Sequence, residues 1–191
     1  MTRLWVICAA ALLTVSAVPA MGQPLRAVAV VDFVDETSDG RMIGAARLSG
    51  DLAAELAGAS GGRLRVVPVE AVRAAMAGRG YGTREIFNTT KMMEIAAAVG
   101  ADVIVTGRWM HLDTDWMTLE QPGTDKERIL YAIGSAMIEV RVIEAPTRQV
   151  LLAQSFSDSV TGFGFGPPVL VLRAARSVLQ QAALTIAKTV P

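Results

Sequence analysis

The order of apolar segments constrains this chain more than any other feature. Strand-like and helix-like segments alternate through the first half, whereas strand-like runs follow one another in the second half. Alternation requires crossover connections and some parallel pairing, and consecutive runs joined by a short turn close as an antiparallel meander. The sequence therefore predicts one α/β domain, a mixed β-sheet flanked by helices, in the order β-α-β-α-α-β-β-β-α. The predicted strands are 27–33, 64–69, 101–112, 129–145 and 150–160, and the predicted helices are 41–59, 69–76, 91–99 and 167–190.

Individual positions add detail to this outline. The strand at 27–33 is apolar on both faces, which is typical of a central strand covered on both sides. Pro68 indicates an edge or terminal position in the strand at 64–69, because proline cannot donate to a β-ladder. Thr89 or Thr90 is the expected cap of the third helix, and Gly107 indicates a bulge or a close approach of another backbone. The last helix is expected to bury a stripe made of Leu172, Ala175, Leu179, Ala182 and Ile186.

The first 22 residues read as a secretory signal peptide. Arg3 precedes a short apolar run that ends at Pro19, and small residues lead to a cleavage site expected near residues 20–22. The run is shorter than the about 20 apolar residues that a membrane-spanning helix needs. Residues 23–191 are therefore expected to form a single domain that is exported to the periplasm.

Cysteine usage supports the same compartment. Cys8 is the only cysteine, and it lies inside the apolar core of the signal. A bacterial lipoprotein needs its cysteine at the cleavage site, so the mature chain is not expected to be a lipoprotein. Removal of the signal leaves no thiol for disulfides, thiolate metal sites or nucleophilic catalysis.

Charge narrows the classes of partner. Lysine and arginine number 18, as do aspartate and glutamate. This balance gives no basic field that would attract nucleic acid or an anionic membrane surface. The expected partners are envelope proteins or a second copy of the chain, with no nucleic acid and no membrane span in the mature chain. A peripheral contact with the outer membrane is left open.

Three segments resemble a known superfamily. They are VAVVDFVDETSDG at 28–40, AAAVGADVIVTGRW at 96–109 and AMIEVRVIEAPTRQVLLAQSF at 136–156. These segments resemble the bacterial envelope proteins that include the curli-secretion protein CsgG, the amino-terminal domain of TolB and the penicillin-binding-protein activator LpoB. The resemblance implies their α/β fold, a non-enzymatic binding or assembly role in secretion or envelope biogenesis, and homo-oligomers.

Residues with catalytic side chains are sparse. His111 is the only histidine, and we expect it to be a surface or packing residue at the end of a strand. Two carboxylate clusters leave open an alternative function, a periplasmic small-ligand binder or hydrolase, but both occur in turn-like sequence. The sequence assigns no catalytic residue, no metal ligand and no cofactor. The clusters are Asp32, Asp35, Glu36 and Asp39, and Asp113, Asp115, Glu120 and Asp125.

Aromatic and thioether side chains are the better candidates for contact. Residues 113–128 read as an insert without a regular pattern, and they contain Trp116 and Met117. The glycine-rich segment before the last helix holds Phe163 and Phe165, which either fold back on the core or serve as exposed anchors. We expect these four residues to carry partner or self-association contacts.

Overall fold

The computed structural model describes residues 25–37, 45–120, 128–162 and 167–191. Its elements follow the predicted order, with the addition of a two-residue strand and a short 3-10 helix. They are β1 (Arg26–Val30), β2 (Val34–Asp35), α1 (Ala45–Ala59), β3 (Leu64–Val66), α2 (Val69–Ala77), η2 (Thr83–Phe87), α3 (Thr89–Val99), β4 (Val103–Glu120), β5 (Arg128–Glu144), β6 (Val150–Gly162) and α4 (Pro167–Thr189).

The strands form one mixed sheet in the order β3-β1-β4-β5-β6, and β2 adds to β4. β1 is parallel to both of its neighbours, so that Val28 lies opposite Val66 on one side and Val103 on the other. β4, β5 and β6 pair antiparallel as successive hairpins. The alternating half of the sequence thus supplies the parallel pairs and the second half supplies the meander, as predicted. β3 is an edge strand, as Pro68 indicated.

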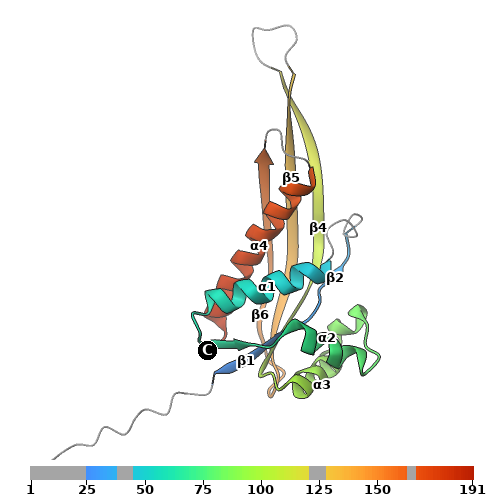
Figure 1. Ribbon diagram of the computed structural model, residues 1–191, viewed down its shortest axis with the longest axis vertical. Helices are drawn as coiled ribbons and strands as arrows, with labels where there is room; N and C mark the ends of the chain where they lie inside the picture. Colours follow the sequence, from blue (N-terminus) through green and yellow to red (C-terminus); the bar gives the residue numbers. More distant parts are fainter. Residues whose placement is uncertain (1–24, 38–44, 121–127, 163–166) are drawn as a thin grey trace, which may run out of the picture.

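Two apolar clusters lie on opposite faces of the sheet. On one face α1 and α4 cover the strands, and Val28 and Val30 belong to this cluster. Figure 1 shows these two helices crossing the same face. On the other face α2 and α3 cover β1 and the start of β4, with Ala27 and Ala29 in their cluster. β1 therefore serves both cores, which explains its uninterrupted apolar sequence.

The face that α2 and α3 cover near β1 is not covered by them along the whole length of β4, β5 and β6. No described helix covers it over the outer parts of β4, β5 and β6, and we call this region the open face. Met137, Glu139 and Arg141 of β5 lie on it, and they are exposed or half-buried. Ser155 and Ser157 of β6 lie opposite two of them in the register and are exposed.

α4 lies against β5 closely enough for its backbone to meet a glycine. A Cβ atom at Gly134 would be 2.3 Å from the carbonyl carbon of Leu170 and 2.4 Å from the nitrogen of Val171. The predicted buried stripe of α4 is correct at four positions but wrong at Leu172, which is 45% exposed. A groove lies between α4 and α1, and its first lining residue on α4 is Gln180. Leu172 lies before that part of α4.

Length and composition alone would allow α4 to cross a membrane. The stretch Pro168–Thr189 has sufficient apolar character, and half of its apolar window is buried inside the protein. Packing on the sheet and on α1 accounts for that apolar character, as it does in the core helix of a globular domain.

β4 and β5 form a long hairpin that extends beyond β6 and α4 (Figure 1). β6 pairs with β5 only as far as Gly162 opposite Ala132, whereas β4 continues its pairing to Glu120. The predicted irregular insert at 113–128 is therefore wrong for 113–120, which continue β4, and for 128, which begins β5; residues 121–127 lie outside the described ranges. Charged residues suggested a loop, but a strand with a solvated face accepts them at alternate positions.

Gly107 shows the close backbone approach that the sequence indicated. A Cβ atom there would be 2.2 Å from the carbonyl oxygen of Glu139 and 2.9 Å from the ring of Phe33. No side chain fits between these groups. Glycine at this position therefore lets β4 lie next to both β5 and the chain that follows β1.

The cap of α3 differs from the prediction. Asn88, one residue before the two threonines, accepts a hydrogen bond from the Lys91 backbone nitrogen at 3.2 Å through its Oδ1. Thr89 and Thr90 are already the first helical residues. Asparagine ranks above threonine as a helix cap, which explains the choice.

Candidate interaction surfaces

Trp116 and Met117 occupy adjacent positions of β4, near the point where β6 ends. Their side chains are 57% and 49% exposed. Because successive residues of a strand face opposite sides, one side chain is available from each face of the hairpin. Phe163 and Phe165 lie outside the described residues.

An open hollow of about 260 Å³ lies beside Met117 on the open face. All three strands of the meander contribute to it, and its lining is largely apolar. Its size suits one side chain of a partner rather than a substrate, since sites for small molecules are larger and more enclosed. The lining residues are Met117, Tyr131, Ile133 and Thr161.

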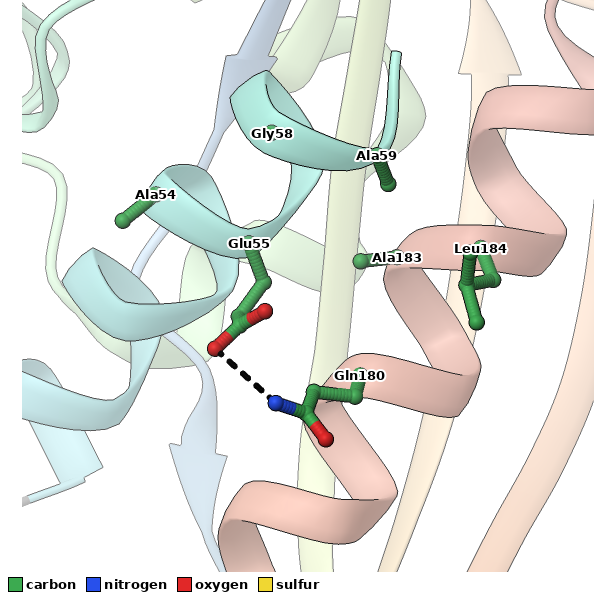
Figure 2. Close-up of a pocket in the computed structure, with 7 residues that line it drawn as sticks. All are labelled: Ala54, Glu55, Gly58, Ala59, Gln180, Ala183 and Leu184. Carbon is green, nitrogen blue, oxygen red and sulfur yellow. Dashed lines mark hydrogen bonds between the residues drawn. The ribbon is translucent and has the colours of Figure 1, made fainter. Parts of the chain in front are cut away.

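A second depression is the groove between α1 and α4, with a volume of about 400 Å³ (Figure 2). Gln180 Nε2 donates to Glu55 Oε1 at 3.4 Å across it. Small side chains on both helices leave this space open, and Leu184 is 52% exposed beside it. The groove was not predicted, although the small alanine and glycine residues at 53–59 are the sequence signal that could have indicated it. The groove is lined by Ala54, Glu55, Gly58, Ala59, Gln180, Ala183 and Leu184.

Arginines bind the first carboxylate cluster. Asp32 accepts two hydrogen bonds from Arg73, at 2.7 and 2.8 Å. Glu36 accepts a hydrogen bond from Arg108 Nη1 at 3.2 Å. These ion pairs engage both carboxylates, an arrangement that does not suit an acid or base that must reach a substrate.

Arg108 links this cluster to the open face. Its Nη2 donates to Glu139 Oε2 at 2.7 Å, and Arg141 Nη2 donates to Glu139 Oε1 at 3.1 Å. The hydrogen bond from Arg108 is the main reason why the pKa of Glu139 lies below its ordinary value. The same bonds to Glu139 and Glu36 raise the pKa of Arg108. The network is a set of ion pairs, and it gives no support to a hydrolytic carboxylate.

His111 lies in the middle of β4, so the predicted position at the end of a strand is wrong. Its Nε2 is 2.9 Å from Ser135 Oγ. The pair is not extended to a triad by Asp113, whose Oδ1 accepts its hydrogen bond from the Thr114 backbone nitrogen and not from His111. Within the described ranges, no group of three or more histidine, aspartate or glutamate side chains could hold a metal ion.

The sequence placed both aspartate clusters in turns, which is correct for Asp35 and wrong for Asp113 and Asp115. Asp35 Oδ1 accepts hydrogen bonds from the backbone nitrogen and the hydroxyl of Thr37, as an Asx-turn requires. Asp113 and Asp115 lie on β4, where they occupy its solvated side. Asp39 and Asp125 lie outside the described residues.

Several solved structures resemble this chain. The crystal structure of lipoprotein GNA1162 from Neisseria meningitidis matches with a TM-score of 0.51 and 16% identity, covering 82% of this chain and 98% of that chain. A putative neuraminyllactose-binding hemagglutinin homolog from Helicobacter pylori matches with a TM-score of 0.51 and 8% identity, covering 88% and 84%. Escherichia coli LpoB, solved by NMR, has a TM-score of 0.48 and 14% identity, covering 72% and 59%.

No protein-family model matches the sequence, and no curated protein does. At such low identity a structural match concerns the fold, because one fold supports many functions. The chain shares its fold with the Neisseria lipoprotein, and the predicted mixed α/β fold is confirmed.

Proposed function

We propose that this protein is a non-enzymatic binding or assembly module of the bacterial cell envelope, and that the β4–β5 hairpin contacts its partner. One observation carries the proposal: Trp116 and Met117 are exposed on adjacent positions of a hairpin that extends beyond the helices (Figure 1). Tryptophan is enriched among the residues that dominate binding energy, because it buries a large area in a partner's pocket.

The two faces of the hairpin offer different contacts. Trp116 presents a large rigid ring on the side of α4, while Met117 presents a flexible thioether beside the hollow on the open face. A partner that encloses the hairpin removes both side chains from water. Full burial of one such side chain contributes about 1.5–3 kcal/mol.

The edge of the sheet supports a second copy of the chain as one such partner. β6 is 13 residues long and lies at one end of the described sheet, whereas β3 at the other end has three residues. Asp158 is the only charged residue of β6, and the strand has no lysine or proline. Long edges without such residues are open to pairing with another strand.

The proposed compartment rests on the predicted signal peptide. A protein of the same fold, GNA1162, is a lipoprotein, whereas the sequence of this chain predicts a mature form without lipid. The intact mass of the exported protein tests this prediction. A chain that begins near residues 20–22 without an added group agrees with it, and a diacylglyceryl group on Cys8 contradicts it.

A double substitution tests the contact surface. Trp116→Ala with Met117→Ser removes both exposed side chains, and Leu172→Ala with Leu184→Ala is the matched control, since those two are 45% and 52% exposed on α4. We expect the hairpin variant to lose self-association, or crosslinking to an envelope protein, by about tenfold or more. Native mass spectrometry and crosslinking in intact envelopes measure the loss.

The control decides how the result is interpreted. Association that survives the hairpin substitutions contradicts the proposed surface. Equal loss in the α4 variant would instead assign the contact to the helices. Circular dichroism of both variants checks that the fold is kept.

A further inference from the structure

A β-bulge in β4 brings two residues of this strand opposite one residue of β5. Trp109 pairs with Ile138, and the next pair is His111 with Met137, which leaves Met110 as the inserted residue. In a β-bulge, both residues of the longer strand oppose the same partner. Met110 and His111 therefore both flank Met137 on the open face.

All three side chains reach solvent. Met110 is 39% and Met137 is 36% exposed, and His111 is exposed as well. Trp109 and Ile138, the pair next to them in the register, are fully buried on the opposite face, which α1 and α4 cover and which we call the covered face. Directly opposed residues have Cβ atoms about 4.5–5.5 Å apart, and methionine has three rotatable side-chain bonds. Two thioether sulfurs and one imidazole nitrogen can thus reach a single ion.

A short chain of hydrogen bonds orients the imidazole. Ser135 Oγ donates to the backbone oxygen of Asp113 at 3.5 Å and lies 2.9 Å from His111 Nε2. With its hydroxyl proton directed at that carbonyl, the Ser135 oxygen can accept the proton of Nε2. With Nε2 bonded to Ser135, Nδ1 is the imidazole nitrogen left for a metal ion.

We propose that Met110, His111 and Met137 bind a monovalent soft metal ion, Cu(I) or Ag(I). Thioether and imidazole ligands favour such ions, whereas calcium and magnesium require oxygen ligands that the three residues do not supply. Asp113, two residues along β4 from His111, accepts a hydrogen bond from the Thr114 nitrogen at 2.7 Å, and its carboxylate oxygens suit hard cations better than a soft ion. The site does not depend on the hairpin contact proposed above.

Silver(I) tests the site without redox chemistry. The mature chain is titrated with silver nitrate while the ¹³C-methyl signals of its methionines are followed by NMR. We expect one equivalent to shift the signals of Met110 and Met137 and to leave that of Met117 in place, although Met117 is also exposed on the open face. Cu(I), supplied without oxygen against a chromophoric chelator, is expected to bind with the same stoichiometry.

Substitutions separate this site from general binding to methionine. Met110→Leu and Met137→Leu are each expected to weaken silver binding by about tenfold or more, and Met117→Leu is the matched control without effect. Ser135→Ala is expected to weaken binding by about tenfold, because it removes the group that fixes the imidazole. Unshifted methyl signals at one equivalent, equal loss in the Met117→Leu variant, or tighter binding of Zn²⁺ than of silver would each overturn the proposal.

Discussion

The two faces of the meander belong to the same strands but have opposite characters. On β5, Ile138 and Val140 are fully buried beneath α4, whereas the alternating residues Met137, Glu139 and Arg141 lie on the open face. The backbone geometry of both sets is the same, because a strand sends successive side chains to opposite sides. The difference is α4, which packs on Ile138 and Val140 and excludes water from them. The residues on the open face remain accessible for ion pairs and for contacts with a partner.

The largest effect is expected where α4 meets the sheet. Gly134→Val places a side chain where the backbone of Leu170 and Val171 lies within 2.4 Å of the new Cβ atom. The helix must move away from β5, which exposes part of the covered core. We expect a loss of about 3 kcal/mol or more in the free energy of unfolding, measured by urea denaturation.

Ser157→Val is the matched control on the opposite face. Ser157 is exposed on β6, opposite Met137 in the register, so an added valine meets water and raises β-propensity. We expect a change within about 0.5 kcal/mol. Similar losses in the two variants would mean that the open face is packed as tightly as the covered face, contrary to the structure.

Local patterning was sufficient to predict most of this fold. The apolar run at 27–33 predicted a central strand, and Gly107 predicted a close approach, because both signals depend on immediate neighbours. Leu172 was predicted to be buried because its spacing fits the buried stripe, but it is exposed, since burial also depends on which other elements pack against that part of the helix. Such three-dimensional limits are not encoded in the spacing of one helix.

The candidate surfaces were predicted less well. Trp116 and Met117 were identified as contact candidates from residue type, but they were assigned to an irregular insert instead of a strand. The bulge at Met110 was not predicted, because a single inserted residue changes the register without a distinct sequence signal. The pairing of Arg108 with Glu139 was also missed, since it joins residues on different strands.

Acid should sharpen the contrast between the faces through Glu139. Hydrogen bonds from Arg108 and Arg141 lower the pKa of Glu139 in the folded protein below its ordinary value of 4.5. A lowered folded-state pKa contributes stability above the unfolded pKa, and this contribution is lost as the pH falls through the folded value. We expect Glu139→Gln to lack this part of the acid sensitivity over the range from neutral pH to below the ordinary value of 4.5.

Urea midpoints of the wild type and the variant across that pH range measure the difference. Asp115→Asn is the control for loss of one negative charge, since Asp115 is exposed on the hairpin. The profile of this control should run parallel to that of the wild type. A Glu139→Gln profile that also runs parallel would mean that the ion pairs add nothing to stability.

The prediction with the smallest effect tests whether side chains fill all of the space between α1 and α4. Gly58 lines the groove between α1 and α4, and a Cβ atom there would have no neighbour within 4 Å (Figure 2). Gly58→Ala should therefore raise stability by about 0.5 kcal/mol, because alanine favours a helix more than glycine does. Gly100→Ala is the matched opposite: its φ of 62° strains any side chain, and we expect a loss of about 1 kcal/mol. If Gly58→Ala were destabilising instead, the groove would have to be narrower in solution than in the structure, and the covered face would be packed without a gap.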